Sequence, residues 1–277
     1  MRLRIRWAGV CDERRSAAAV PAEGNCRIVG VPSGGLLREA RQQRQLPEQL
    51  VPQVCLLDPD GDVARHLARS GHATRSEAWA CYHSELWLTA RSGMQIGVVL
   101  RAVGAPYAVL VAEELHASGC NLVISVTSAG RILPIGDPPC FLLIERAWRD
   151  EGTSLHYLPP SEWAELRPEL SQRLAGRFDE LGEPLLRGAS WTTDAPFRET
   201  AQAIAAAQAA GVHAVEMEAA GLYAYAMATG RDVVCVAHVT NTMAVAGDDF
   251  DKGTDDGTHR ILTVVEAISN RLSRSAT

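Results

Sequence analysis

The sequence predicts a single α/β domain in which helices flank a central, mostly buried sheet. Short apolar runs typical of buried strands alternate with segments of helical period along most of the chain. The chain has 277 residues, of which 47% are hydrophobic, enough to bury the core of one large domain. Beyond residue 50 there is no linker rich in glycine, serine or proline, and no internal repeat. We therefore expect one domain over residues 51–277, preceded by a partly irregular N-terminal extension over residues 1–50.

In the first half of the chain, apolar runs and turn residues predict a succession of helices and strands. The expected elements are an exposed helix over 36–45, a strand over 54–57, a helix over 63–70, strands over 86–90 and 96–100, and a helix over 106–116. Ser92 and Gly93 form the turn between the paired strands. Pro106 suits the first turn of the last helix, and Gly119 ends it.

The second half continues the alternation. The expected elements are strands over 121–126 and 141–144, helices over 163–181 and 198–210, a strand over 214–217, a helix over 219–229, a strand over 233–239 and a helix over 262–272. Pro168 should kink or restart the first of these helices. Since the strands are near-continuous apolar runs, we expect the sheet to be covered on both faces.

Composition excludes several classes of protein. No run of about 18 apolar residues predicts a membrane span, and the basic start, Met1 to Arg6, is not followed by the apolar segment of a signal peptide. The net charge is −6 and no basic stripe carries interleaved aromatic residues, which argues against a nucleic-acid partner. The seven cysteines form no CxxC pair and no zinc-ligand spacing, so we expect reduced core thiols, no bound metal and a cytoplasmic location.

Four segments carry chemistry-bearing residues in a recognisable order. They are Asp58–Arg65 (DPDGDVAR), Ala102–Gly130, Trp191–Glu199 (WTTDAPFRE) and Val215–Ala220 (VEMEAA). In this order and spacing they resemble the nucleoside phosphorylase-I family, which includes purine nucleoside phosphorylases, uridine phosphorylases and related nucleosidases. The resemblance implies a central mixed sheet, partly closed into a barrel and flanked by helices. It also implies a homo-oligomer, a trimer or hexamer, with sites near the subunit contacts.

The first two segments carry candidate phosphate ligands. A phosphorylase must hold a dianion, for which arginine forks and exposed backbone N–H groups are suited. Gly61 lets the backbone approach an anion, and Arg65, one turn into the next helix, points back at the same place. Ser128 follows a buried strand, where small hydroxyls cradle anions. The resemblance implies that all three bind phosphate, and an ordinary turn with a surface arginine is the alternative.

The chain departs from the family next to this hydroxyl. Family members commonly carry an arginine three residues before it, and this chain has Ser125 there. We expect Arg101 to replace the missing charge, because an arginine that closes an apolar strand is costly to bury unless it meets an anion. A structural ion pair of Arg101 is the alternative. The departure also leaves open a hydrolase that uses water instead of phosphate.

Glu216, Met217 and Glu218 form the candidate ribose site, at a turn from strand to helix. One carboxylate accepts hydrogen bonds from both ribose hydroxyls, while the methionine lines the sugar. A bound 2′-hydroxyl also helps to spread the charge of an oxocarbenium ion. The resemblance implies that Glu218 binds the hydroxyls, Met217 packs on the sugar and Glu216 lies nearby. A helix N-terminus with favourable acids in its first turn is the alternative.

Phe197, Arg198 and Asn241 are the candidate base ligands. The resemblance implies that Phe197 stacks on the base with Arg198 beside it, where an arginine donates to a carbonyl. Asn241 donates a hydrogen bond to the leaving base but is no acid near neutral pH, which favours uridine-like or 6-oxopurine substrates over adenine. A core phenylalanine, a helix cap starting at Asp194 and a structural turn at Asn241 are the alternatives.

Two further segments have weaker signals. Tyr82 and His83 lie where the family often reaches across a subunit contact, although an ordinary aromatic pair is the preferred interpretation. The acidic loop 248–257 resembles a calcium loop only faintly, since it lacks glycine at the sixth and glutamate at the twelfth position counted from Asp249. We expect a solvated loop over the site.

Together these residues predict a nucleoside phosphorylase, a pentosyltransferase with Arg65, Glu218 and Asn241 as its catalytic residues. The expected partners are a nucleoside and inorganic phosphate, the latter as co-substrate and with no other cofactor. A nucleosidase and a non-catalytic nucleoside-binding protein remain as alternatives.

Overall fold

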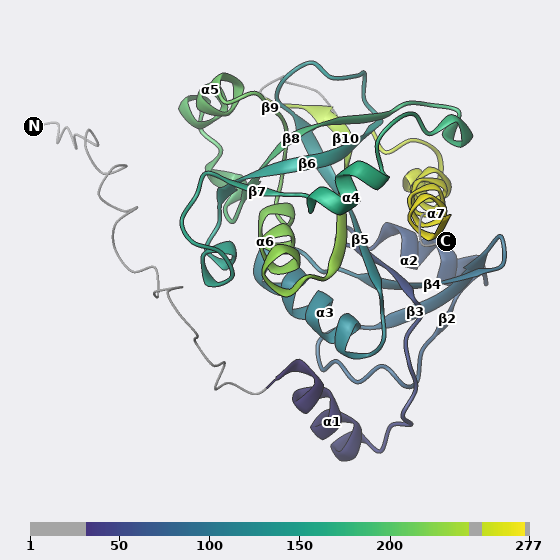
Figure 1. Ribbon diagram of the computed structural model, residues 1–277. Helices are drawn as coiled ribbons and strands as arrows, with labels where there is room; N and C mark the ends of the chain where they lie inside the picture. The colour runs from purple at the N-terminus through teal and green to yellow at the C-terminus, as the bar shows by residue number, and fades with distance from the viewer. Residues whose placement is uncertain (1–31, 244–250, 275–277) are drawn as a thin grey trace, which may run out of the picture.

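The computed structural model describes residues 32–243 and 251–274, and a mixed ten-stranded sheet forms the centre of that part of the chain (Figure 1). The strands are β1 (Val54–Asp58), β2 (Thr74–Arg75), β3 (Leu86–Arg91), β4 (Met94–Leu100), β5 (Leu122–Arg131), β6 (Cys140–Asp150), β7 (Trp163–Glu165), β8 (Leu185–Thr193), β9 (Val212–Glu216) and β10 (Asp232–Thr242). Their order across the sheet is β10-β6-β8-β9-β5-β1-β4-β3-β2, and β7 pairs with β6.

The sheet closes on itself at one end. Strand β10 pairs with β6 in antiparallel and with β5 in parallel orientation. As a result β10, β6, β8, β9 and β5 form a ring of paired strands, and β1, β4, β3 and β2 continue from β5 as an open sheet. The predicted single α/β domain with a mixed, partly barrel-like sheet is confirmed.

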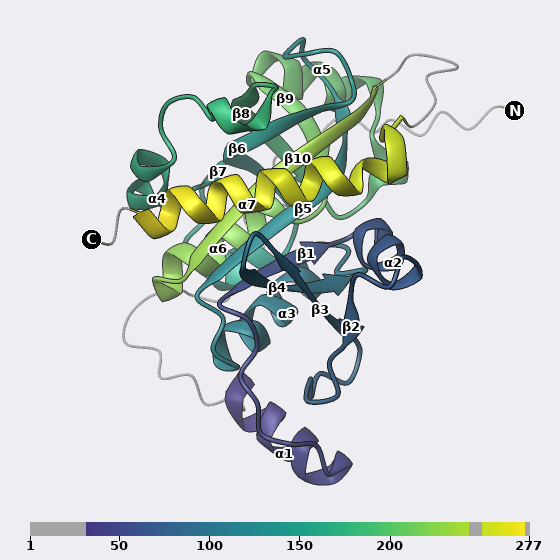
Figure 2. The ribbon, with the colours of Figure 1, turned by 90° about the vertical axis from the view of Figure 1, so that its right-hand side faces the viewer.

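Helices cover the sheet on both sides (Figures 1 and 2). They are α1 (Ser33–Arg44), α2 (Asp62–Arg69), α3 (Ala105–Ala117), α4 (Pro168–Arg173), α5 (Ala201–Ala209), α6 (Ala219–Thr229) and α7 (Thr258–Arg274), with short 3-10 helices η1 (Thr153–His156), η2 (Asp179–Leu181), η3 (Pro196–Arg198) and η4 (Thr254–Gly257). Helices α3 and α6 pack together on one side, and α2 and α7 on the other. The first pair approaches closely at Gly221, where a Cβ would lie 2.7 Å from that of Ala105. In the described ranges no helix is long and apolar enough to cross a membrane.

The parallel strands β1, β4, β5 and β10 bring the candidate residues to one edge of the sheet. The register of β1 with β4 places Arg101 beside the turn that contains Gly61. The register of β5 with β10 places Ser128 and Asn241 on neighbouring strands, towards their carboxyl ends. Strand β9 meets β5 from the opposite direction and ends beside the same stretch, at Glu216.

The prediction of one helical stretch over 163–181 is wrong. Residues Trp163–Glu165 form strand β7, because Trp163 pairs with Trp148 in the antiparallel ladder with β6, and their ring centroids lie 6.5 Å apart. Helix α4 then begins at Pro168, whose fixed φ suits the first helical turn. Interleaved acids and bases therefore indicate a helix here only after the proline.

Other elements differ from expectation in their ends. Strand β8 has no counterpart among the predicted strands. Helix α5 begins at Ala201 instead of residue 198, because the Thr200 side chain caps it by accepting the Ala203 N–H at 3.1 Å. Strands β5 and β10 are longer than predicted, so Ser128 and Asn241 lie inside strands and not in the turns that follow them.

The helix expected to be exposed has one buried face. Helix α1 begins at Ser33 and packs Leu37 and Ala40 against Ala80. It lies in the predicted N-terminal extension, of which residues 1–31 fall outside the described residues, and the predicted boundary at residue 50 stays a prediction. The cysteines that the structure describes are buried and free, as expected for core thiols: Cys55, Cys81, Cys120, Cys140 and Cys235.

Candidate active site

Gly61 is the point where two candidate phosphate ligands meet. It directly precedes α2 and adopts a φ of 75°, in the left-handed region that favours glycine. A Cβ at this position would lie 3.1 Å from Nη1 of Arg65 and 3.3 Å from Cγ of Arg101. Arg101 itself has a φ of 62°, a conformation that costs energy for any residue but glycine. The structure therefore brings Gly61, Arg65 and Arg101 together, and holds Arg101 there against backbone strain.

The buried carboxyl group of Asp58 holds this turn through hydrogen bonds to its backbone. Asp58 ends β1, and its two side-chain oxygens accept the N–H groups of Gly61 at 3.1 Å and Ala64 at 3.0 Å. Burial raises the pKa of Asp58 to about 7, and the charges of Asp60 and Asp62 act in the same direction, against the two N–H groups. Asp58 thus fixes the position and orientation of the first turn of α2.

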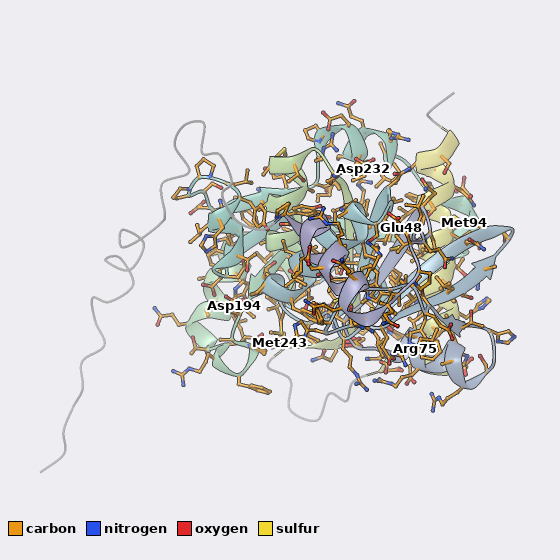
Figure 3. The ribbon with its side chains drawn as sticks, turned by 90° about the horizontal axis from the view of Figure 1, so that it is seen from below. Glu48, Arg75, Met94, Asp194, Asp232 and Met243 are labelled. Atoms are coloured by element: carbon orange, nitrogen blue, oxygen red, sulfur yellow. The ribbon has the colours of Figure 1, made fainter. Side chains whose placement is uncertain are left out.

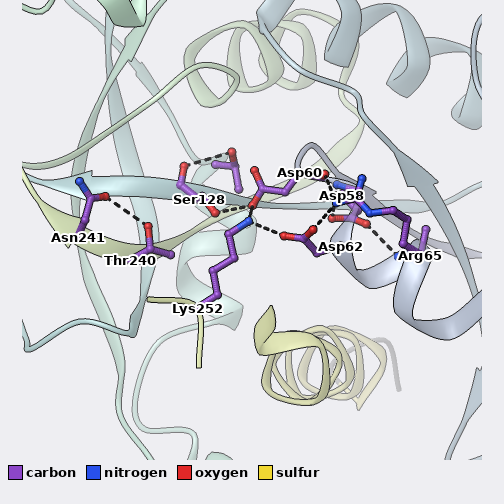
Figure 4. Close-up of polar contacts among 11 residues, drawn as sticks. Asp58, Asp60, Asp62, Arg65, Ser128, Thr240, Asn241 and Lys252 are labelled. Atoms are coloured by element: carbon purple, nitrogen blue, oxygen red, sulfur yellow. Dashed lines mark hydrogen bonds and ion pairs between the residues drawn. The ribbon is translucent and has the colours of Figure 1, made fainter. Parts of the chain in front are cut away.

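Ser128 lies in a cluster of alternating charges (Figure 4). Its hydroxyl donates to Oδ2 of Asp60, which also accepts from Nζ of Lys252 at 2.9 Å. The Lys252 ammonium forms a second ion pair with Asp62, which in turn pairs with Arg65. Carboxylates therefore alternate with cations where the sequence predicts a phosphate site of two arginines, a serine and a glycine.

Sequence reasoning misses Asp60 and Lys252. Lys252 lies in the acidic loop for which the sequence predicts solvation, and residues 248–250 of that loop fall outside the described part of the chain. The one sequence feature that distinguishes Lys252 is that it is the only lysine of the chain. Nothing local connects it with Asp60, which is 192 positions away.

Position 125 does not supply the missing cation. Ser125 lies in β5 and is almost fully buried, and its hydroxyl has no hydrogen-bond partner among the described residues. The family arginine therefore has no local replacement on this strand, and the cations near Ser128 come from elsewhere.

Glu218 is the candidate ribose ligand and is 1% exposed. Its Oε1 accepts the N–H of Gly104 at 2.7 Å, and the Thr127 hydroxyl also hydrogen-bonds the carboxyl group. Burial, followed by the charge of Glu216, raises the pKa of Glu218 to about 8. Since Thr127 directly precedes Ser128 on β5, Glu218 and Asp60 contact successive residues of the same strand.

Glu216 is already fully hydrogen-bonded within the chain. Its Oε1 accepts from the hydroxyls of Ser190 at 3.0 Å and Thr192 at 2.5 Å, and its Oε2 accepts the N–H groups of Glu218 and Ala219, both at 2.7 Å. Burial raises the pKa of Glu216 against these hydrogen bonds. This arrangement matches the alternative of a carboxylate that caps a helix, here α6, and it leaves Glu218 as the carboxyl group with an acceptor to offer a sugar.

Met217 and Asn241 border the same region. Met217 is half-buried between the two glutamates, and its N–H donates to Oε2 of Glu218 at 3.3 Å. The Asn241 side chain is half-buried, and its Oδ1 accepts from the Thr240 hydroxyl at 3.3 Å (Figure 4). That contact occupies the amide oxygen, and within the described residues Nδ2 has no hydrogen-bond acceptor and can donate to a ligand.

Two of the three candidate base ligands, Phe197 and Arg198, are exposed. Phe197 is 99% exposed on η3, and Arg198 beside it is also exposed. The alternative of a core phenylalanine is therefore wrong. Asp194 caps no helix either, since its carboxylate accepts the N–H of Gly152 at 3.0 Å. Strand β8 connects this loop to the ribose region through Thr192.

The aromatic pair near residue 82 makes ordinary contacts. The Tyr82 hydroxyl donates to Oε1 of Gln43 at 2.8 Å, and the His83 carbonyl accepts from the Tyr107 hydroxyl at 2.7 Å. Within residues 32–243 and 251–274, no group of three or more histidine, cysteine or acidic residues is placed to hold a metal ion.

The described groups together suit one type of chemistry. Arginine side chains and a hydroxyl attract an oxyanion, a buried carboxyl group binds vicinal hydroxyls, and an amide stabilises a leaving group that gains negative charge. These are the requirements for cleaving the bond between a sugar carbon and a nitrogen base.

Comparison with known proteins gives the same result. Residues 53–270 match the family model of the phosphorylase superfamily. A uridine phosphorylase of Thermococcus kodakarensis is 29% identical, in a match that covers 68% of this chain and 78% of that protein. The fold is similar to the crystal structure of purine nucleoside phosphorylase from Toxoplasma gondii in complex with immucillin-H, with a TM-score of 0.66 and 18% identity over 82% of this chain and 94% of that one. The resemblance read from the sequence is confirmed: because the family model spans most of its length, this chain belongs to the phosphorylase superfamily.

Proposed function

We propose that this protein catalyses the reversible phosphorolysis of a ribonucleoside to a free base and ribose 1-phosphate. The observation that carries the proposal is the convergence of Arg65 and Arg101 on Gly61, at the edge of the sheet where Ser128 and Glu218 also lie. Two arginine side chains beside one turn, together with a hydroxyl, suit an oxyanion. The reaction needs no cofactor, because inorganic phosphate is the co-substrate.

Each group has a defined task in the proposed reaction. Phosphate lies under C1′, held by Arg65, Arg101 and Ser128, while Glu218 binds the ribose hydroxyls. The C1′–N bond breaks with its electron pair passing to the base, and a phosphate oxygen then forms the C1′–O bond. Asn241 donates a hydrogen bond to the base as negative charge develops on it.

The proposed base carries a carbonyl group, as in uridine or a 6-oxopurine nucleoside. The Asn241 amide has Nδ2 as its available donor, which pairs with a carbonyl or a ring nitrogen. Arg198 supplies a further donor on the candidate base loop. The similarity to a uridine phosphorylase supports the same choice.

A nucleosidase, which hydrolyses the same bond, is the second candidate because one contact favours it. The Ser128 hydroxyl donates to the Asp60 carboxylate, and Ser125 replaces the family arginine. A carboxylate at this position repels a phosphate dianion, and it can take a proton from an attacking water molecule.

The decisive experiment measures base release from uridine, inosine, adenosine and methylthioadenosine, with and without phosphate. We expect release of uracil or hypoxanthine that depends on phosphate and yields ribose 1-phosphate in equal amount. Equal rates in phosphate-free buffer, with ribose as the product, would establish the nucleosidase instead. Tight nucleoside binding without turnover under either condition would indicate a non-catalytic binding protein.

We further propose that the protein is a homo-oligomer in the cytoplasm. Phe197 is fully exposed, and Val103 is also an exposed apolar residue. Val103 directly precedes Gly104, whose N–H donates to Glu218. A second copy that covers these two side chains would complete the base site. Buried free thiols fit a reducing compartment. Light scattering coupled to size-exclusion chromatography tests the first proposal, with a monomer as the contrary result, and cell fractionation tests the second.

A further inference from the structure

A single carboxylate oxygen accepts hydrogen bonds from two donors of the candidate phosphate site. Oδ2 of Asp60 accepts from the Ser128 hydroxyl and from the Lys252 ammonium, the latter at 2.9 Å (Figure 4). Hydroxyl and ammonium groups donate to a phosphate oxygen in the same way. The Asp60 carboxylate therefore has the hydrogen-bond partners that this edge of the sheet would otherwise offer to phosphate.

Lys252 is suited to bind a small anion. Burial favours its neutral amine, but the hydrogen bonds to Asp62 and Asp60 outweigh burial and raise the pKa of Lys252 above its ordinary value. It is therefore a cation at neutral pH. Its side chain is 21% exposed, which leaves it within reach of a dissolved ion.

We propose that Lys252 is the phosphate-binding cation that compensates for the arginine absent at position 125, and that Asp60 is a built-in competitor of phosphate. This proposal rests on the proposed function, because it names two further residues of the same site. Without phosphate, Asp60 neutralises Lys252 and holds the Ser128 hydroxyl. When phosphate binds, both donors pass to phosphate oxygens, and Lys252 keeps its ion pair with Asp62.

The charges around the cluster explain why the exchange is selective for a dianion. Two anions at contact distance repel strongly in a partly buried site, so Asp60 must leave Ser128 before phosphate enters. A dianion recovers this cost because it meets Arg65 and Arg101 as well as Lys252, whereas a weakly charged ion does not. The KM for phosphate therefore includes the work of displacing Asp60.

A simpler explanation of the Lys252 ion pairs is that they only hold the segment before α7 against the start of α2. Ion pairs near the surface contribute little to stability, and Lys252 would then act through its two aspartates alone. In that case its removal lowers the stability of the protein slightly at most and leaves the affinity for phosphate unchanged. The two explanations thus predict different changes in different measurements.

The first test compares the KM for phosphate at saturating nucleoside. We expect Lys252→Met to raise it about tenfold to a hundredfold, as for the loss of a charged hydrogen bond, and Lys252→Arg to restore most of the affinity. We expect Asp60→Asn to lower it by about tenfold, since the competing charge is gone. The KM for the nucleoside should stay unchanged in all three. An unchanged phosphate KM in Lys252→Met, or a raised one in Asp60→Asn, would overturn the proposal.

The controls come from a matched ion pair at the other end of β10. Arg167 pairs with Asp232 at 2.7 Å, and the Arg167 side chain is about as buried as that of Lys252. Figure 3 shows Asp232 on the opposite side of the molecule from Met243, which directly follows β10. Arg167→Met and Asp232→Asn remove the same charges as the test variants and should leave both KM values unchanged.

The second test measures binding without turnover. Because Lys252 is the only lysine, reductive methylation followed by peptide mass spectrometry reports on this one side chain. Phosphate should slow its methylation in the wild type, and at a lower concentration in Asp60→Asn. No protection by phosphate at any concentration that supports turnover would overturn the proposal. Failure of the proposed function appears separately, as base release that needs no phosphate.

Discussion

Replacing Gly61 by alanine separates backbone strain from site geometry, because Gly71 provides a matched control. The two glycines lie on either side of α2 with φ values of 75° and 73°. A Cβ at Gly71 would meet no heavy atom within 4 Å, whereas one at Gly61 would lie 3.1 Å from Arg65 Nη1 and 3.3 Å from Arg101 Cγ. Both substitutions carry the same strain, and only Gly61→Ala also presses on the guanidinium of Arg65 and on Cγ of Arg101.

The expected magnitudes follow from these contacts. An alanine in the left-handed region costs about 1 to 2 kcal/mol, and each kcal/mol lowers the melting temperature of a domain of this size by about 2 to 4 °C. The flexible end of Arg65 moves away and Arg101, which is contacted at Cγ, shifts slightly, so the two variants should be similarly stable. A displacement of about 1 Å in a positioning group reduces the rate about a hundredfold, and contacts at 3.1 and 3.3 Å require a shift of a few tenths of an ångström. We expect Gly61→Ala, but not Gly71→Ala, to lower kcat/KM for phosphate by about fourfold.

The assay combines thermal unfolding with steady-state kinetics at varied phosphate. The expected result is an equal loss of Tm in the two variants and a kinetic loss in one of them. If both variants lose activity equally, strain at the ends of α2 and not the position of the guanidinium groups controls the site. If Gly61→Ala retains full activity, Gly61 does not mark the phosphate site.

Three further results are expected from the same structure. Glu218→Gln should lower kcat by about tenfold to a hundredfold through the lost ribose contact. Since the pKa of Glu218 is raised to about 8, this variant should also be more stable than the wild type above pH 8. A less stable variant at that pH would contradict the raised pKa. Phe197→Ala should raise the KM for the nucleoside with an unchanged Tm, because the ring is fully exposed, and an unchanged KM removes Phe197 from the base site. The free energy of unfolding, measured with urea, should fall by about 3 kcal/mol between pH 6.5 and 8.5. The folded pKa values of Asp58 and Glu218, about 7 and 8, lie above their ordinary values, so their stabilisation is complete at low pH and is lost as the pH rises through the folded values. His116 and His238, with pKa lowered to about 4, act in the opposite direction only below about pH 6.5, and a rise in stability across the higher window would contradict the burial of the two carboxyl groups.

The elements that the sequence predicts well carry their signals in neighbouring residues. Pro106 opens α3 and Gly230 follows α6, and each acts through its own backbone preference. Strand β7 illustrates the contrary case, because Trp163 becomes part of a strand only through its partner Trp148 on β6. Local polarity gives no sign of that partner.

The candidate site divides in the same way. Gly61, Arg65 and Glu218 lie in short motifs whose residue types and order along the chain indicate their chemistry. The structure places all three at one edge of the sheet. The capping of α6 by Glu216 depends on the hydroxyls of Ser190 and Thr192, which belong to a strand without a clear sequence signal. The role of a carboxylate is decided by the donors around it, and these come from other segments.

The amino-acid sequence by itself determined the fold class and the family, since their signals lie in residues close together in the chain. Only the tertiary structure decided which charges meet at that place. The pairing of β1, β5 and β10 brings Asp60, Ser128 and Lys252 within contact distance. Coulomb interactions depend on distance in space, and no spacing along the chain specifies that distance.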